Sequence, residues 1–408
     1  MQNYRSTRRS CYVGYITQAI ACNLAPIFYL IFQNTFDITR TQIGQIVLVL
    51  FLVQLVVDLL SVLFIKKLGE RGTCLLAHAS ATAGLILMSF LPFIMDPFAG
   101  IMLAVVLVAI GSGLIEVMIS PIVNALPKDD SGKDSMALLH SFYCWGQAAV
   151  VLITTLALRL IGGDHWNLLP LFWAIIPGAN FFAFLRVPLV KIDGDEPLSL
   201  RDFVKNPVFY LSFILMICSG VSEQAMSQWA SYFAEAGLGV TKVMGDLLGP
   251  CLFAILMAIG RVGYALLGDR LDLSKCLAVC GCVAVISYLT AVFSPYPILS
   301  LFGCAACGFG VSLLWPGMLS LSAERFPNGG STLFALLALG GDIGCSTGPF
   351  LTGIVSDAVT KNETLLRFAE DHAISTASLG VKAGLLSVIV FPLTMVIGVL
   401  LLRKAKNK

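Results

Sequence analysis

The stretch from Ala99 to Ala125, AGIMLAVVLVAIGSGLIEVMISPIVNA, decides the class of this protein. It contains one charged residue, Glu116, and it exceeds the roughly 20 apolar residues that a helix needs to cross a bilayer. A continuous apolar run favours a helix over a barrel strand, which would show about ten residues of alternating polarity. We therefore interpret this stretch as a transmembrane helix.

The rest of the chain repeats this pattern. The 408 residues are 57% hydrophobic and 12% charged, with a mean hydropathy of +0.88, whereas an average soluble domain is about 25% charged. The twelve predicted spans are Cys11–Phe32, Ile43–Ile65, Thr73–Ile94, Ala99–Ala125, Met136–Ile161, Leu168–Leu189, Val208–Ala234, Met244–Gly268, Ser274–Phe293, Pro297–Ala323, Thr332–Asp357 and Leu379–Leu402. The sequence thus predicts an all-α polytopic membrane protein in a lipid bilayer.

Charge and motifs exclude several function classes. The 26 basic and 24 acidic residues give a net charge of +2, so no basic stripe is available to neutralise nucleic-acid phosphates. The 12 cysteines lie mostly in apolar runs, unlike the framework of a secreted disulfide scaffold. The sequence has no Walker loop, nucleophile elbow or zinc-protease motif. We therefore expect no enzyme activity, no cofactor and no metal site.

The distribution of Lys and Arg predicts the orientation. With twelve spans, 19 of the 26 basic residues fall on the side of the two termini, six fall on the opposite side, and Arg261 lies within a span. Cytoplasmic segments carry an excess of Lys and Arg in membrane proteins. Both termini are therefore expected to be cytoplasmic, in a multi-pass protein of the plasma (inner) membrane.

A polar stretch divides the spans into two sets of six. This predicted cytoplasmic linker, 191–206 (KIDGDEPLSLRDFVKN), separates an N-terminal six-helix bundle at 1–190 from a C-terminal six-helix bundle at 207–408. Two parallel six-span repeats, with a substrate site near the bilayer midplane, form one of the main transporter architectures. We expect two pseudo-symmetric bundles and a protein that functions as a monomer.

Charged residues inside spans are the first candidates for function, because each costs about 2.5–3.5 kcal/mol at a helix centre. Glu116 lies well inside the fourth span, where a carboxyl group can bind and release a proton for coupling. His140, early in the fifth span, could relay that proton, since imidazole titrates near neutral pH. Each could instead only hydrogen-bond to a neighbouring helix.

The seventh span contains a cluster typical of a polyhydroxy ligand site. Glu223, Gln224 and Gln228 offer donors and acceptors for hydroxyl groups, and Trp229 offers an aromatic face for a sugar ring. The same amides could instead join two helices. Asp342 in the eleventh span could bind a cation or substrate, or could serve packing or gating.

Four charged residues near predicted cytoplasmic span ends are expected to form ion pairs that latch one conformation. These gating candidates are Asp58, Arg261, Asp269 and Arg270.

Several segments of this sequence resemble those of known transporters. Gly260-Arg261-Val262-Gly263-Tyr264, leading to Gly268-Asp269-Arg270, resembles the loop signature of the major facilitator superfamily, with Ala265 and Asp272 where glycine is commoner. Segments similar to the fucose–proton symporter family are Gly113–Glu116 with Ser120–Val123, His140–Gly146, Glu223–Trp229 with Tyr232, Trp315–Leu321, and the glycine-rich eleventh span ending at Gly348-Pro349.

This resemblance implies roles for particular residues. Glu116 falls at the family's proton-coupling glutamate of the fourth span, and His140 and Tyr143 fall where the family has polar side chains facing its sugar. Asn23 and Trp315 complete the predicted substrate-binding set. One position departs from the family: the acidic residue expected in the first span would fall near Pro26, where only Asn23 and Gln33 are polar. Because some members use sodium, the coupling ion stays open between proton and sodium.

The sequence therefore predicts a secondary transporter that works by alternating access and imports a small polar solute, a monosaccharide or related polyol, by cation symport. Efflux of an amphipathic organic compound is a second hypothesis, against which the Gln224, Gln228 and His140 side chains weigh. A non-transporting solute sensor is a third. Sensors usually carry a sizeable soluble output domain, whereas the segments between these spans are short.

Overall fold

The computed structural model describes residues 4–38, 40–127, 135–190, 203, 205–234, 238–371 and 374–406. In these ranges the chain consists of helices joined by turns, without a strand. Unit 1 comprises the described residues of Met1–Ser131, Leu138–Leu200 and Phe326–Leu339, and unit 2 those of Gly132–Ala137, Arg201–Arg325 and Gly340–Lys408. Most of the predicted linker, 191–202 and 204, lies outside the described residues, so the predicted bundle boundaries stay a prediction.

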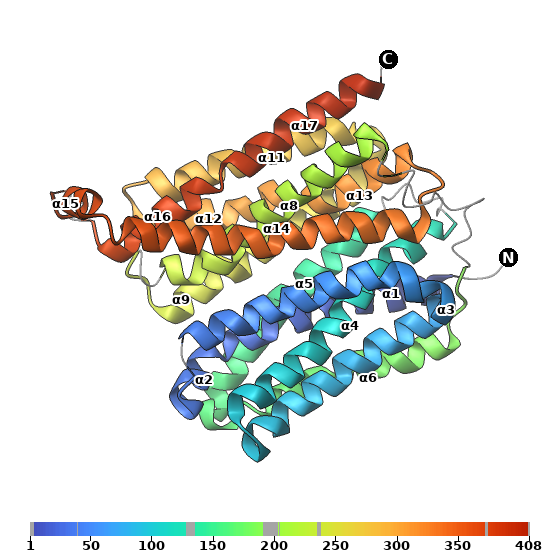
Figure 1. The fold of residues 1–408 in the computed structure, drawn as a ribbon, viewed down its shortest axis with the longest axis horizontal. Coiled ribbons are helices and arrows are strands. Elements are labelled where there is room, and N and C mark those ends of the chain that lie inside the picture. The colour runs from blue at the N-terminus through green and yellow to red at the C-terminus, as the bar shows by residue number, and fades with distance from the viewer. Residues whose placement is uncertain are drawn as a thin grey trace. The chain divides into compact units, whose positions relative to one another are not determined.

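Unit 1 is a helical bundle. Its helices are α1 (Arg5–Ile27), α2 (Tyr29–Phe36), α3 (Arg40–Ile94), α4 (Pro97–Ala125), α5 (Ser135–Ile161) from Leu138 onward, the 3₁₀ turn η1 (Gly163–His165), α6 (Leu168–Arg186) and the start of α14 (Gly330–Val359) up to Leu339. Figure 1 shows α1, α4 and α6 together, and α3 packs against both α4 and α6. Gly69 interrupts α3 with a φ of 67°, a backbone region open to glycine, and this separates the second and third predicted spans.

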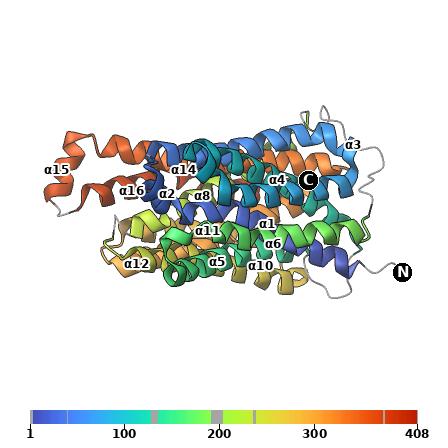
Figure 2. The ribbon, with the colours of Figure 1, turned by 90° about the horizontal axis from the view of Figure 1, so that it is seen from below.

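Unit 2 is a second helical bundle. Its elements are α8 (Pro207–Tyr232), α9 (Lys242–Asp246), the π-turn η3 (Leu247–Cys251), α10 (Leu252–Leu267), η4 (Gly268–Arg270), α11 (Leu273–Phe293), α12 (Pro297–Val311), α13 (Leu314–Arg325), α14 (Gly330–Val359) from Gly340 onward, α15 (Glu363–Asp371), α16 (Thr376–Ser387) and α17 (Val390–Lys406). Helix α8 packs against α12, α13 and α17. Figure 2 shows the short helix α15 at the end of the bundle where the chain passes from α14 to α16.

The predicted twelve-helix membrane fold is confirmed. Ten helices of the described chain are long and apolar enough to cross a membrane. The other two crossing segments are α1 with α2, and the first part of α3, which contains the apolar helix Gln45–Leu60. Helix α1 is less apolar than these ten helices, and its buried residues include Ser10, Thr17 and Gln18.

Prolines break spans that the sequence predicts as continuous. The tenth span divides into α12 and α13 at Ser312, four residues before Pro316. The twelfth divides into α16 and α17 at Val388, four residues before Pro392. Proline has no N–H to donate to the carbonyl four residues earlier, so each break removes one hydrogen bond of the helix. The Val388 carbonyl accepts instead from the Phe391 N–H at 3.1 Å.

Glycines let the site-bearing helices approach closely. A Cβ at Gly111 on α4 would lie 2.7 Å from the carbonyl oxygen of Ala77 on α3. In unit 2, a Cβ at Gly344 on α14 would overlap the carbonyl oxygen of Ile217 on α8. Small residues allow this backbone contact between membrane helices, which fixes the side chains that the helices carry.

Candidate functional site

Three polar contacts join α1 to α4 in unit 1. They are Tyr15 Oη to Ser120 Oγ at 2.6 Å, Gln18 Nε2 to Glu116 Oε2 at 2.7 Å, and Cys22 Sγ to Ser112 Oγ at 3.5 Å. Residues three, four or seven apart share one face of a helix, so each set of three lines one face of α1 or α4. We call this row of contacts the α1–α4 polar ladder.

The middle contact of the ladder holds the buried carboxyl group. Glu116 is 8% exposed and Gln18 is 6% exposed. The 2.7 Å separation is typical of a hydrogen bond to an ionised group. A buried carboxylate is tolerated only when it is hydrogen-bonded, and the Gln18 amide supplies such a bond. The predicted proton-coupling residue thus lies in a shielded site with a neutral hydrogen-bond donor.

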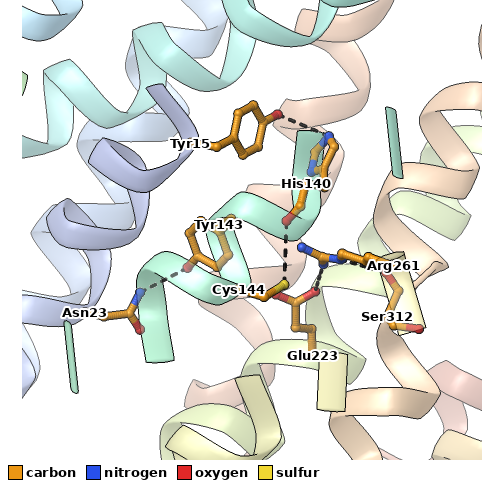
Figure 3. A network of polar contacts seen from close by, with 8 residues as sticks. All are labelled: Tyr15, Asn23, His140, Tyr143, Cys144, Glu223, Arg261 and Ser312. Atoms are coloured by element: carbon orange, nitrogen blue, oxygen red, sulfur yellow. Dashed lines mark hydrogen bonds and ion pairs between the residues drawn. The ribbon is translucent and has the colours of Figure 1, made fainter. Parts of the chain in front are cut away.

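Helices α5 and α3 add to the two ends of the ladder. His140 Nε2 on α5 lies 3.1 Å from the Tyr15 hydroxyl (Figure 3) and 3.4 Å from Ser120 Oγ. Gln54 Nε2 on α3 donates to Ser112 Oγ at 3.1 Å. Hydroxyl and imidazole groups can both donate and accept hydrogen bonds, so the end that holds Tyr15, Ser120 and His140 can pass a proton.

Two predicted substrate-binding residues contact each other in unit 1. Asn23 Nδ2 on α1 donates to the Tyr143 hydroxyl on α5 at 3.3 Å (Figure 3) and to the carbonyl of Ala19 at 2.9 Å. Both side chains are half-buried. An amide and a phenol that remain partly accessible can bind the hydroxyl groups of a polar solute.

Unit 2 contains a buried ion pair that bridges three helical segments. Arg261 Nη2 on α10 lies 3.3 Å from Glu223 Oε2 on α8, and Arg261 Nε donates to the Ser312 carbonyl at 2.8 Å (Figure 3). Ser312 is the residue whose carbonyl Pro316 leaves open. The guanidinium of Arg261 therefore neutralises the Glu223 carboxylate and also donates a hydrogen bond to the carbonyl left open at the helix break. From the sequence we predicted separate roles for Arg261 and Glu223, and the structure brings the two side chains together.

The amide cluster of α8 also makes contacts within unit 2. Gln228 Nε2 donates to Gln224 Oε1 at 3.2 Å, as expected for residues four apart on one helix face. Trp229 Nε1 donates to the carbonyl of Pro349 on α14 at 3.1 Å. Gln224 is buried, whereas Gln228 and Trp229 are half-buried. Only the last two therefore retain accessible surface for a ligand.

Trp315 and Asp342 lie on neighbouring helices of unit 2. A Cβ at Gly341 on α14 would overlap the Trp315 ring on α13, so the ring lies against the α14 backbone. Trp315 is 8% exposed, and Asp342, the next residue after Gly341, is 2% exposed. Because glycine has no side chain, Gly341 leaves the space that the Trp315 ring occupies.

The remaining gating candidates lie in different surroundings. Asp58 on α3 is buried, one helical turn from Gln54. Arg270 is exposed in η4. The side chain of Asp269 lies outside those that the structure describes. Their latching role stays a prediction.

Most residues of the ladder were not predicted from the sequence. No site role was predicted for Tyr15, Gln18, Ser112, Ser120 or Gln54, although the first two lie three residues apart and each serine lies four residues from Glu116. That spacing was the available signal, because polar residues on one face of an apolar span indicate a buried polar contact.

A second polar cluster in unit 1 was also missed. His78 Nδ1 on α3 lies 2.7 Å from the Cys74 carbonyl, and Asn180 on α6 lies 2.8 Å from His78 Nε2. Asn180 also donates to the Ser10 carbonyl on α1 at 2.9 Å. With every polar atom of the imidazole bonded inside the bundle, this cluster joins three helices.

The described contacts in these clusters are hydrogen bonds and one ion pair. Among the described residues, no group of three or more His, Cys, Asp or Glu side chains could hold a metal ion. The carboxyl, imidazole, phenol and amide groups suit recognition of a neutral polar solute and movement of a proton.

Comparison with known proteins identifies the family. The family model described as Major Facilitator Superfamily matches residues 11–361. This chain belongs to the major facilitator superfamily. The superfamily consists of membrane transporters, so the chain is a multi-pass membrane protein with a transporter fold, and the family is not one of enzymes.

Individual relatives agree with this family. The membrane protein MosC of Rhizobium meliloti is 22% identical over 337 residues, covering 82% of this chain and 80% of MosC. A structure of the E. coli fucose:proton symporter FucP superposes with a TM-score of 0.72 at 16% identity, covering 97% of this chain and 99% of that chain. A structure of the proton:xylose symporter XylE gives 0.74 at 11% identity, covering 98% and 95%. These superpositions establish the fold of the superfamily.

Proposed function

We propose that this protein moves a small polar solute, a monosaccharide or related polyol, together with a proton by alternating access. The observation that carries the proposal is the buried Glu116 carboxyl bonded to Gln18 in the α1–α4 polar ladder. A carboxyl group in an apolar span is costly and is retained where it does work. Protonation removes the negative charge of Glu116, so the transporter can exist with this carboxyl group either charged or neutral.

The proposed solute class follows from the accessible polar groups. Asn23 and Tyr143 in unit 1, and Gln228 and Trp229 in unit 2, are half-buried and offer amide, phenol and indole groups. Hydroxyl groups of a sugar need such donors and acceptors, and a sugar ring packs on an aromatic face. Two structural neighbours bear the names of a fucose:proton and a proton:xylose symporter, which supports a sugar-like solute.

The orientation of the chain and the membrane in which it lies also form part of the proposal. The excess of Lys and Arg on the terminus side supports cytoplasmic termini, and we place the protein in the plasma membrane as a functional monomer.

The solute is found by binding before transport is measured. Purified protein is screened by thermal unfolding against sugars, polyols, nucleosides and organic acids, with and without sodium and across pH. A ligand that binds the folded state raises its apparent stability. Stabilisation by amphipathic organic compounds alone would contradict the proposed solute class.

Transport of the stabilising solute then tests the role of Glu116 in proteoliposomes. We expect Glu116→Gln to keep counterflow exchange and to lose uphill uptake driven by a pH gradient, because glutamine cannot carry the proton. Glu363→Gln, at an exposed position in α15, is the matched control and should behave like wild type. Undiminished gradient-driven uptake by Glu116→Gln would remove this residue from coupling, and uptake driven only by sodium would identify the other ion.

A further inference from the structure

The middle contact of the ladder contains a polar atom that the proposed function leaves unexplained. Gln18 Nε2 donates to Glu116, but Gln18 Oε1 is buried and has no hydrogen-bond partner in the part of the chain that the structure describes. A buried acceptor without a partner destabilises a fold. Position 18 therefore holds an amide of which only the donor half is used in this state.

Protonation of Glu116 changes what the amide can bind. A carboxylate only accepts hydrogen bonds, whereas a protonated carboxyl group also has an O–H to donate. The last torsion of a glutamine side chain is broad and roughly two-fold, so rotation exchanges Oε1 and Nε2. After rotation, Gln18 Oε1 can accept the hydrogen bond that the protonated Glu116 donates. The unused oxygen thereby acquires a role in the second state.

Other residues at position 18 would serve one state at most. Methionine has a similar length and would fill the space, but it offers the carboxylate no N–H. Glutamate would place a second carboxyl group 2.7 Å from the first at the present geometry, and two such groups cannot both be ionised. An amide of this length pairs with both forms.

We propose that Gln18 is a positioning residue that hydrogen-bonds Glu116 in both protonation states and sets the pH range over which Glu116 exchanges its proton. The mechanistic meaning of this inference rests on the proposed coupling role of Glu116. The hydrogen bond itself, and its effect on titration, can be measured without a transported solute.

Other ionisable groups lie on the helices that contact α4 and have to be separated from Glu116. Asp58 and His78 lie on α3, Tyr15 and Cys11 lie on α1, and His140 on α5 contacts Ser120. Asp58, the carboxyl group among them, is distinguished by comparing wild type with Glu116→Gln, which deletes only the Glu116 carboxyl signal.

The experiment is a pH titration of the full-length protein in lipid nanodiscs, followed by infrared difference spectroscopy of the carboxyl C=O band. We expect Gln18→Met to move the Glu116 midpoint to higher pH by about one unit, a tenfold change in proton affinity. The reason is that the lost bond to the carboxylate is roughly twice as strong as the bond to the neutral acid.

Gln54→Met is the matched control. Gln54 is also buried, donates to a residue of α4 at 3.1 Å and has an Oε1 without a partner among the described residues, but it bonds Ser112 instead of Glu116. Its replacement should leave the midpoint unchanged. Equal midpoints for Gln18→Met and Gln54→Met would overturn the proposal.

A second variant keeps the test decisive if Gln18→Met does not fold. Gln18→Glu should titrate in two steps, because neighbouring carboxyl groups share one proton, and a single step would overturn the contact. The coupling proposal fails separately, if Glu116→Gln retains uptake driven by a pH gradient. A shifted midpoint together with retained uptake would leave the contact established and Glu116 outside coupling.

Discussion

Two buried glutamates in this protein have different partners. Glu116 in unit 1 accepts a hydrogen bond from the neutral amide of Gln18, whereas Glu223 in unit 2 lies 3.3 Å from the guanidinium of Arg261. Their exposed fractions, 8% and 7%, are nearly equal. The difference between the two sites therefore lies in the charge of the partner and not in the depth of burial.

The partner determines whether the carboxyl group can exchange a proton at low cost. Protonation of Glu116 leaves a neutral pair of side chains. Protonation of Glu223 would leave the Arg261 charge buried at 2% exposure without its counter-ion. Breaking a buried ion pair from one side costs about 3–5 kcal/mol. Protonation is thus less costly at Glu116 than at Glu223, as the proposed coupling role of Glu116 requires.

The same substitution at both sites should give the largest difference. We expect Glu223→Gln to destabilise the protein by about 3–5 kcal/mol, because it leaves the Arg261 charge without its counter-ion. Glu116→Gln should cost at most about 1.5 kcal/mol, because its neighbour is neutral and an amide can still hydrogen-bond. Thermal unfolding in detergent at neutral pH measures both, with Glu363→Gln as the exposed control. Equal losses would end the distinction between the sites.

The second prediction examines why Arg261 is needed in unit 2. Its Nε donates to the Ser312 carbonyl. Pro316 cannot donate to that carbonyl because proline has no N–H. In Pro316→Ala, residue 316 can supply that bond. We therefore expect Arg261→Met to cost about 1 kcal/mol less in the Pro316→Ala background than in wild type, as measured by a double-mutant cycle.

Proline at another helix provides the control for this cycle. Pro121 also lies inside a helix, α4, but belongs to unit 1. Pro121→Ala should leave the cost of Arg261→Met unchanged. If both proline variants change that cost equally, the Ser312 carbonyl is not what couples Arg261 to the break in the tenth span.

Much of the fold could be predicted from the sequence, because the bilayer requires long apolar helices. Apolar runs of about 20 residues in the sequence predicted the spans. The breaks at Ser312 and Val388 were missed although Pro316 and Pro392 are visible in the sequence. A proline can kink, break or be absorbed by a helix, and neighbouring groups such as Arg261 decide which.

The site was less predictable because side-chain partners depend on how helices pack. Sequence alone identified Glu116 and Glu223 as costly buried charges but named neither partner. Gln18 is 98 residues from Glu116, and Arg261 is 38 residues from Glu223. No local spacing rule connects such pairs, so only the packed bundle distinguishes an amide-bonded carboxyl group from an ion-paired one.

A third carboxyl group, outside the spans, should show the smallest effect. Asp272 caps α11 by accepting a hydrogen bond from the Lys275 N–H at 3.0 Å and lies 3.3 Å from Arg403. The Lys275 N–H and the Arg403 charge hold the pKa of Asp272 below its ordinary value. Solvent screens the exposed pair with Arg403, so the helix cap should dominate. We expect Asp272→Ala to cost about 1 kcal/mol at neutral pH.

The pH dependence of this cost distinguishes a capping carboxylate from a packing contact. Because folding lowers the pKa of Asp272, its contribution is fully present above the ordinary value of about 3.9 and is lost as the pH falls through the lower folded value. The difference in melting temperature between wild type and Asp272→Ala should therefore shrink between about pH 4 and pH 2. Asp96→Ala, which removes the cap of α4, is the matched variant. A difference for Asp272→Ala that persists unchanged at acidic pH would show that the side chain stabilises α11 without its charge.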